Sequence, residues 1–311
     1  MLASPAAASP EADGQTVLVR PGSGAEYREP PRMRDDGRVN TDATAGPPHD
    51  TDRSRLYPRV TSFRFRRGTL TPGQQRNWEQ LWPSLGRDLR TGPDRAQEPP
   101  LDAAAWFDRQ APLIVEVGSG TGVATAAMAA EETDHDIVAV EVYQPGLAQL
   151  LGLVDRAGLT NVRMVRGDAT VVFTELLGPD SLAGVRVFFP DPWPKARHHK
   201  RRFLQSGTLE LIADRLAPGG ILHIATDHAD YAEWIARLLA TQDPARPHVI
   251  PWTRTPEQPQ PPILTERPTT KFEGRADREG RLVNEFVYVK PRDAGPAAEA
   301  RPDAEQKGTQ V

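Results

Sequence analysis

Residues 113–122 read Leu-Ile-Val-Glu-Val-Gly-Ser-Gly-Thr-Gly, a short apolar run that passes directly into a glycine-rich turn. Residues 123–131, which follow the turn, are rich in alanine and have the composition of a helix. A buried strand, a glycine turn and a helix in this order are typical of the first unit of a doubly wound α/β sheet.

The same alternation continues along the chain. Further strands rich in Val and Ile are predicted at residues 136–142, 162–165, 185–189, 221–225 and 283–289. Helices are predicted between them, one opened by Pro145 and others near residues 170–177, 203–215 and 229–240. Because helical crossovers join parallel strands, this order predicts an α/β fold with a doubly wound, Rossmann-like and mostly parallel sheet.

The pattern is confined to the middle of the 311-residue chain. Residues 1–55 and 293–311 carry many Pro and Ala residues and show no helix or strand periodicity. Such segments bury too little apolar surface to offset the entropy of ordering, so we predict that both are disordered. Residues 56–292 are expected to form one domain, with the proline-rich stretch 243–262 as a surface excursion.

Charge and composition exclude several classes of protein. Lys and Arg number 38 against 42 Asp and Glu, a net charge of −4, so any binding to nucleic acid must come from a local basic patch. The absence of cysteine excludes a disulfide framework and thiolate zinc sites. Neither an apolar run of membrane-spanning length nor a signal-peptide pattern is present, which predicts a soluble, cytoplasmic protein.

Three acidic residues accompany the ends of three successive predicted strands: Glu116, Glu141 and Asp168. Gly118 and Gly120 let a ligand approach the backbone closely, but the spacing G-x-G-x-G differs from the G-x-G-x-x-G of a dinucleotide loop. Carboxylates suit the amino-acid part, the ribose and the adenine amino group of S-adenosylmethionine better than a diphosphate. The alternatives are a tight turn without a ligand and, for Asp168, a helix N-cap that can coexist with a ligand contact.

The segment 188–202 reads Phe-Phe-Pro-Asp-Pro-Trp-Pro-Lys-Ala-Arg-His-His-Lys-Arg-Arg. Asp191 lies between two prolines at the end of a strand, where a rigid backbone fixes its direction. Residues 195–202 carry five Lys or Arg and two His without an acid, and a second basic run lies at residues 53–67. We interpret both runs as contacts to a phosphate backbone beside a catalytic pocket. A solvated charged face is the alternative, and the adjacent His198 and His199 are poorly placed to share a metal ion.

Two further loops belong to the same edge of the predicted sheet. Asp227 follows the fifth predicted strand, and Thr269-Thr-Lys-Phe-Glu273 lies in the last connection. In an extended chain Lys271 and Glu273 point to one side and can bracket a polar base with a donor and an acceptor. Without that context, either loop could be only a turn.

Taken together, these motifs resemble the bacterial tRNA (guanine-N7-)-methyltransferase family. The resemblance runs from about Arg59 to about Lys290, and the Pro-Asp-Pro-Trp segment with its basic continuation is its most specific part. It implies a class I methyltransferase fold with seven strands, S-adenosylmethionine as cofactor, tRNA as partner, no metal, and guanine 46 of the variable loop as target.

The resemblance also implies a role for each matched residue. Glu116, Gly118, Gly120, Glu141, Asp168 and Asp191 map to the S-adenosylmethionine site, with Asp191 also the proposed catalytic residue. The residues mapped to guanine recognition are Lys195, Asp227, Thr270, Lys271, Phe272 and Glu273. The residues mapped to RNA contact are Arg197, His198, His199, Lys200, Arg201 and Arg202.

Three other functions compete with this interpretation. A catalytically silent RNA-binding module would not need the acids after all three strands. A nicotinamide-dependent oxidoreductase predicts G-x-G-x-x-G, which is absent at residues 118–122. A methyltransferase acting on a small molecule would not need basic runs at residues 53–67 and 195–202.

Overall fold

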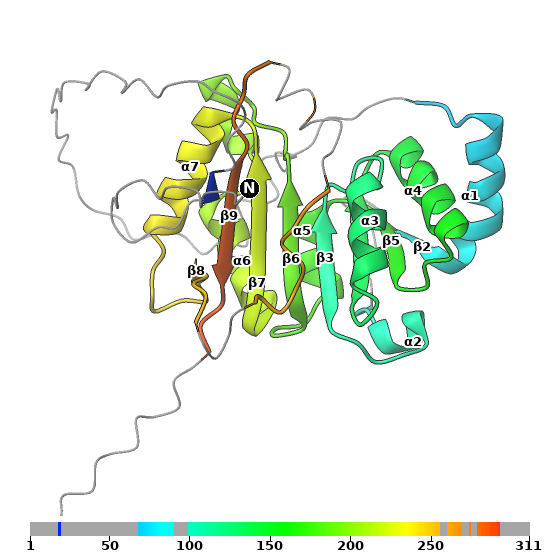
Figure 1. Cartoon of the computed structure of the whole chain (residues 1–311), viewed down its shortest axis with the longest axis horizontal. Helices are drawn as coiled ribbons and strands as arrows, with labels where there is room; N and C mark the ends of the chain where they lie inside the picture. Colours follow the sequence, from blue (N-terminus) through cyan, green and yellow to red (C-terminus); the bar gives the residue numbers. More distant parts are fainter. Residues whose placement is uncertain are drawn as a thin grey trace, which may run out of the picture.

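The computed structural model describes residues 68–89, 99–255, 260–268 and 279–292, together with Gly274 and the backbone of Leu18–Val19. These residues form one sheet flanked by helices (Figure 1). The basic run 53–67, the segment 269–273 and almost all of the two ends predicted to be disordered lie outside the described residues.

The sheet has the order β1-β9-β7-β6-β3-β4-β5-β2, with β8 also paired to β9. Its parallel centre consists of strands predicted from the sequence: β3 (Leu113–Val117), β4 (Asp136–Glu141), β5 (Val162–Arg166), β6 (Leu182–Phe188) and β7 (Leu216–Thr226). The last predicted strand, β9 (Asn284–Val289), runs antiparallel to β7. The predicted doubly wound, mostly parallel sheet is confirmed.

Three short strands were not predicted. β2 (Gly86–Asp88) pairs in parallel with β5 at one edge of the sheet and, with the six predicted strands, completes seven. The two-residue strands β1 (Leu18–Val19) and β8 (Ile250–Pro251) both pair antiparallel with β9. β8 lies within the proline-rich stretch that was expected to be irregular.

The predicted helices are present as α3 (Val123–Glu131), α4 (Gln144–Ala157), α6 (Ser206–Arg215) and α7 (Ala229–Ala240). The helix predicted near residues 170–177 is a short α5 (Ala169–Val171) that continues as a π-helical turn, Val172–Leu176. Two helices were missed, α1 (Pro72–Leu85) and α2 (Ala103–Phe107).

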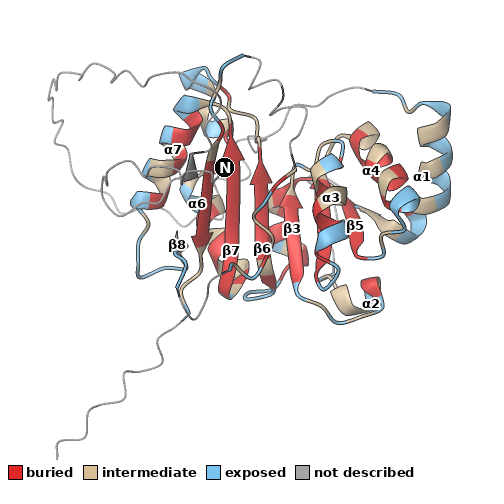
Figure 2. Cartoon of the chain, viewed as in Figure 1, coloured by how far each residue is buried: buried red, intermediate tan, exposed pale blue. Residues whose placement is uncertain are grey.

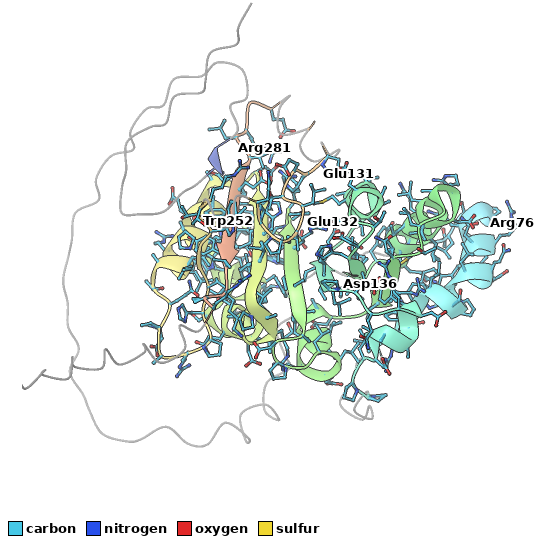
Figure 3. All side chains as sticks on the ribbon, turned by 60° about the horizontal axis from the view of Figure 1, so that its bottom comes forward. Arg76, Glu131, Glu132, Asp136, Trp252 and Arg281 are labelled. Atoms are coloured by element: carbon cyan, nitrogen blue, oxygen red, sulfur yellow. The ribbon has the colours of Figure 1, made fainter. Side chains whose placement is uncertain are left out.

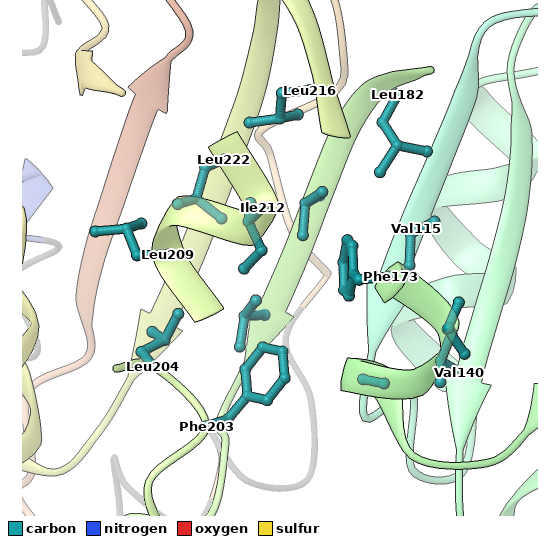
Figure 4. Close-up of a cluster of buried hydrophobic side chains, with 14 of the residues drawn as sticks. Val115, Val140, Phe173, Leu182, Phe203, Leu204, Leu209, Ile212, Leu216 and Leu222 are labelled. Atoms are coloured by element: carbon teal, nitrogen blue, oxygen red, sulfur yellow. The ribbon is translucent and has the colours of Figure 1, made fainter. Parts of the chain in front are cut away.

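The helices cover both faces of the sheet, so its central strands are buried on both sides (Figure 2). Side chains alternate along β3: Ile114 belongs to the core under α1 and α4, whereas Val115 belongs to the core under α5, α6 and α7. Figure 4 shows the second of these cores, in which Phe173 and Ile212 pack against strand residues. This two-sided core fixes the strand ends that carry the predicted site.

Candidate active site

The carboxyl ends of the parallel strands form one edge of the sheet, and the predicted site residues lie along it. From β3 the chain winds outward to β4 and β5, and then returns to β6 on the other side of β3. β3 and β6 are therefore neighbours at which the direction of winding reverses, and ligands of such sheets bind at this switch point. Glu141 and Asp168 lie on one side of it, and Asp191 and Asp227 on the other.

The turn after β3 has a backbone that favours glycine. Gly118, Gly120 and Gly122 have φ angles of 74°, 58° and 72°, in the left-handed region. A Cβ atom on Gly118 would meet nothing within 4 Å, so open space borders the backbone there. Helix α4 packs closely on the same turn, because a Cβ atom on Gly146 would lie 2.1 Å from the Gly120 carbonyl oxygen.

Glu141, at the end of β4, holds the glycine turn in place. Its Oε2 accepts a hydrogen bond from the backbone N of Gly120 at 3.0 Å. Its Oε1 accepts from the backbone N atoms of Val142 at 2.6 Å and Tyr143 at 2.9 Å. Three backbone donors thus direct this carboxylate, at the position where doubly wound nucleotide binders place an acid for the ribose.

Glu116 lies within β3 and is only 3% exposed. Its Oε2 has no hydrogen-bond partner among the described residues. Burial raises the pKa of Glu116, and the guanidinium of Arg186, at the paired position on β6, acts in the opposite direction. Thr125 also lowers this pKa, although the geometry between its hydroxyl and the carboxylate lies outside the range of a hydrogen bond. A buried carboxylate with an unused oxygen fits a ligand that brings an amino group.

Asp168 follows β5 and acts as the N-cap of α5, since its Oδ1 accepts a hydrogen bond from Thr170 N at 2.9 Å. The neighbouring Gly167 N donates to the carbonyl of Glu141 at 3.1 Å, which joins the ends of β4 and β5. The N-cap interpretation of Asp168 is confirmed. A ligand contact would come in addition to it.

Asp191 lies in a loop with a strained backbone. Phe189 and Trp193, on either side of Pro190-Asp191-Pro192, have φ angles of 47° and 44°, which bulky residues rarely adopt. Such conformations cost about 1–3 kcal/mol each and persist only where the surroundings impose them. Trp193 is buried, and the Pro192 carbonyl accepts a hydrogen bond from Arg202 Nε at 2.9 Å. A stiff loop therefore directs the half-buried side chain of Asp191.

The basic cluster that follows forms a 3-10 helix, Ala196–Arg201. Lys195, Arg197 and Lys200 are exposed, whereas His198 and His199 are half-buried. The Arg201 guanidinium lies 3.6 Å from the centre of the Trp193 ring, a cation–π contact that ties the helix to the loop of Asp191. The cluster therefore presents a charged surface directly beside that loop.

Arg202 differs from the other cations because it is only 2% exposed. Its guanidinium is bonded to the carboxylate of Asp230 and lies over the rings of Tyr231 and Trp234, at 4.9 and 5.3 Å from their centres. Arg202 was predicted to contact RNA, but in the structure its side chain is buried behind the exposed cations and donates a hydrogen bond to the carbonyl of Pro192.

The residues mapped to guanine recognition are only partly described. Asp227 follows β7 and forms an ion pair with Arg281, a residue that precedes β9 (Figure 3). Lys195 is exposed at the start of the basic cluster. Thr270, Lys271, Phe272 and Glu273 lie outside the described residues.

Several charged or polar residues buried within the strands were not predicted, among them Arg186 in β6, His223 in β7 and Glu285 in β9. None of these three is more than 4% exposed. Each interrupts an otherwise apolar strand pattern. A charged or polar residue at such a position indicates a buried pair, because buried charges are nearly always paired, and this signal could have identified them.

The fold and the site define the class of this protein as a methyltransferase of the Rossmann-like type. The family model described as "Putative methyltransferase" matches residues 110–286, from just before β3 to within β9. No helix among the described residues is long and apolar enough to cross a membrane.

Curated relatives narrow the class to one family. A "tRNA (guanine-N(7)-)-methyltransferase" of Nocardia farcinica is 52% identical over 243 residues, which cover 76% of this chain and 86% of that protein. Proteins of the same description from Mycolicibacterium paratuberculosis and Rhodococcus jostii are 52% and 51% identical and cover 80% and 85% of this chain and 93% and 99% of their own lengths. The chain belongs to the tRNA (guanine-N(7)-)-methyltransferase family.

Proposed function

We propose that this protein transfers a methyl group from S-adenosylmethionine to N7 of a guanine in tRNA, and that guanine 46 of the variable loop is its target. The observation that carries the proposal is the meeting of two features at one sheet edge. Acidic residues line the ends of β3, β4 and β5, and an exposed basic 3-10 helix follows the Asp191 loop after β6. The relatives named for this activity are about half identical to the chain.

The residues at the glycine turn fit the cofactor. Glu116 offers a buried carboxylate oxygen without a partner, which suits the cofactor's amino group. Gly118 leaves room for close approach to the backbone, Glu141 would bind the ribose hydroxyls, and Asp168 would bind the adenine amino group. When bound, S-adenosylmethionine supplies an electrophilic methyl group on a sulfonium ion.

Guanine N7 has an in-plane lone pair and carries no proton at neutral pH, so it needs no general base. The protein therefore acts mainly by alignment, holding N7 in line with the methyl group at near-attack distance. Asp191 grips the donors of the base or stabilises the positive charge that develops on the purine. The base must leave its stack to reach this pocket.

The acceptor is recognised by two groups of residues. Lys195, Asp227 and the segment 270–273 bind the guanine, and the outward-facing residues of Arg197–Arg201 bind the phosphate backbone. Arg202 is not among the residues proposed to bind the phosphate backbone, because its guanidinium forms an ion pair with Asp230.

The experiment that tests the function incubates bulk tRNA with labelled S-adenosylmethionine, digests it and searches for 7-methylguanosine. A tRNA transcript with adenine at position 46 is the matched control and should take up no label. Label found only in nucleosides other than 7-methylguanosine would exclude the proposed reaction. Equal formation of 7-methylguanosine in the adenine-46 transcript and in the same transcript with guanine 46 would exclude position 46.

The role of Asp191 is tested by Asp191→Asn, which keeps the size of the side chain and removes its charge. We expect the single-turnover rate with saturating cofactor and tRNA to fall about 100- to 1000-fold, as when one stabilising group is removed from an active site. Asp180→Asn, in a turn before β6 and paired with Lys290, is the control and should retain the wild-type rate. A wild-type rate in Asp191→Asn would remove Asp191 from the chemistry.

A further inference from the structure

The segment 260–268, here called the strap, crosses the sheet face on the side of α3. Figure 1 shows it in orange, running in front of the strands toward their carboxyl ends. Ile263 packs onto β6, since a Cβ atom on Gly184 would lie 2.7 Å from its Cδ1. The strap therefore links the far end of the sheet to the edge that carries the site.

A buried ion pair holds both backbone polar groups of one strap residue. Arg186 Nη2 donates to the two carboxylate oxygens of Glu132 at 2.7 and 2.6 Å, and to the Leu264 carbonyl at 3.0 Å. Glu132 Oε1 in turn accepts from Leu264 N at 2.6 Å. Glu132, at the end of α3, is labelled in Figure 3. Because Arg186 is fully buried and Glu132 nearly so, this clamp on Leu264 is shielded from water.

A second buried pair holds the strap three residues further on. Arg267 Nε donates to Glu285 Oε1 at 2.8 Å, and His223 Nε2 lies 2.7 Å from the same oxygen. Burial lowers the pKa of His223, against the effect of Glu285, so the imidazole is neutral and donates its Nε2 proton. Arg267 is therefore the cation that balances Glu285.

From this anchor the Arg267 guanidinium reaches the loop that directs Asp191. It lies 5.3 Å from the ring centres of both Phe188 and Phe189. Leu264 packs in the same cluster of side chains as these two rings. Phe189 is one of the two residues that hold a left-handed backbone around Asp191, so the strap supports the strained side of that loop.

We propose that Arg267 is a positioning residue for Asp191, anchored by Glu285 and by the clamp on Leu264. Its planar guanidinium packs on Phe188 and Phe189 and keeps Phe189 in the conformation that directs Asp191 toward the acceptor base. This inference rests on the proposed function, because the consequence of a misdirected Asp191 is read as methyl transfer.

The test is Arg267→Lys, which keeps the charge beside Glu285 and removes the planar group that covers two rings. We expect the single-turnover rate to fall about 10- to 100-fold, because a small displacement at the reacting centre has an effect of that size. The dissociation constant of S-adenosylhomocysteine should rise by less than the rate falls. Asp191 is only one of the residues assigned to the cofactor, and Glu141 and Asp168 lie on the other side of the switch point.

Arg109→Lys is the matched control. Arg109 is also bonded to a buried carboxylate, Asp136, but at the opposite end of the strands. Arg109→Lys should lower the thermal stability by less than Arg267→Lys, because the Arg109 side chain is 35% exposed, and should leave the single-turnover rate unchanged. A wild-type rate in folded Arg267→Lys, or a parallel loss of cofactor affinity, overturns the proposal.

A second variant covers the case in which Arg267→Lys does not fold. Glu132→Gln weakens the clamp without touching Asp191 or its loop, and should raise amide hydrogen exchange in residues 263–268 together with a slower methyl transfer. Faster exchange with an unchanged rate overturns the proposal. Two further results distinguish the proposed function from the positioning role of Arg267. A wild-type protein that forms no 7-methylguanosine in the same assay would exclude the proposed function. A crystal structure of Arg267→Lys in which the φ angle of Phe189 is unchanged would exclude the positioning role alone.

Discussion

At the scale of single residues, Glu116 shows how a binding group is kept ready at the expense of stability. Its carboxylate is buried with one oxygen unpaired, and burial raises its pKa. The folded state therefore holds a proton on Glu116 more tightly than the unfolded chain does. Between the ordinary pKa of 4.5 and the raised value, the contribution of this group to stability falls as pH rises.

Glu116→Gln removes the charge and keeps the size. We expect the ligand-free variant to be more stable than wild type at pH 7 by about 1 kcal/mol, roughly 2–4 °C in Tm, because an unpaired buried carboxylate is costly. Its affinity for S-adenosylhomocysteine should fall about 10- to 100-fold with the loss of a charge-assisted hydrogen bond. Scanning calorimetry and titration calorimetry measure the two effects.

The pH dependence gives a further check on Glu116. The stability difference between wild type and Glu116→Gln should shrink as pH falls toward 4.5, because wild type then carries the proton as well. Glu131→Gln, at the exposed last residue of α3, is the control (Figure 3). If Glu116→Gln is no more stable than wild type at pH 7, the buried carboxylate of Glu116 does not destabilise the ligand-free protein.

Sequence patterns alone could predict which residues gather at the site, but not how each side chain is occupied. Position after a strand predicts that Glu141, Asp168 and Asp191 share one edge, because parallel strands end on the same side. The same reasoning treats Arg202 as one more exposed cation. Its burial depends on Asp230 and on two rings of α7, which are distant in sequence from the basic cluster.

At the scale of elements, the close packing of α4 on the glycine turn makes Gly146 a sensitive position. Gly146→Ala places a Cβ atom 2.1 Å from the Gly120 carbonyl, which is backbone and can yield only if the helix or the turn moves. We expect a loss of about 1–3 kcal/mol in unfolding free energy, measured by denaturant titration, and a weaker affinity for S-adenosylhomocysteine.

Gly152→Ala is the matched control on the same helix. Its Cβ would meet only the Asn77 Nδ2 atom at 2.9 Å and the Arg156 Nη1 atom at 3.1 Å, the ends of side chains that can rotate away. Since alanine favours helix by up to about 1 kcal/mol over glycine, this variant should be at least as stable as wild type. Equal effects of the two substitutions would show that close approach of α4 to the turn is unimportant.

The 3-10 helix after the Asp191 loop predicts a division of roles among neighbouring cations. Arg197→Ala should weaken tRNA binding with little effect on stability, and should reduce the salt slope of log K by about 1. The wild-type slope itself should be about −4 to −5 if about six phosphates are contacted. Arg202→Ala should instead destabilise the protein by about 1–3 kcal/mol, because it removes a buried side chain that packs on Tyr231 and Trp234 and leaves the Pro192 carbonyl without its donor.

Filter-binding titrations over a range of salt concentrations, together with thermal unfolding, separate these two effects. The proposed RNA surface is contradicted by a wild-type slope near zero. The interior role of Arg202 is contradicted by a variant as stable as Arg197→Ala.

The elements themselves were predictable where hydrophobic periodicity is strong. The runs at β3, β4, β5, β6, β7 and β9 are apolar enough to stand out, and each was predicted within a few residues. β2 and α2 were missed because three- and five-residue elements carry too little periodicity. α1 was missed although it begins with a capping box of Thr71 and Gln74, a signal that can be read in the sequence.

At the scale of the whole molecule, the buried pair of Glu285 and Arg267 ties the last strand to the strap and should influence acid stability. Burial alone would raise the pKa of Glu285, but the hydrogen bond from His223 and the charge of Arg267 outweigh it and lower this pKa to about 2. The stabilisation is therefore complete above the ordinary value of 4.5 and is lost as pH falls toward 2.

Glu285→Gln should cost about 3 kcal/mol of unfolding free energy at pH 7, because it leaves Arg267 buried without its counter-ion. The difference between wild type and variant should shrink between pH 4.5 and the acid limit, which urea titrations at several pH values can follow. A difference that stays constant from pH 7 to pH 3 would show that Glu285 does not respond to acid as its surroundings imply.

The order of strands in the sheet has a consequence for how the family can diversify. Apart from Asp191, the residues assigned to the methyl donor come from β3, β4 and β5 in the first half of the fold. The residues assigned to the guanine come after β6 begins. The two halves are joined along the central pair of strands and by a few side-chain contacts, such as those of Arg186 with Glu132 and of Arg215 with Phe173. A chimaera that exchanges residues from 181 onward between relatives should thus inherit the acceptor preference of one parent while retaining the donor pocket of the other, as interchangeable modules would.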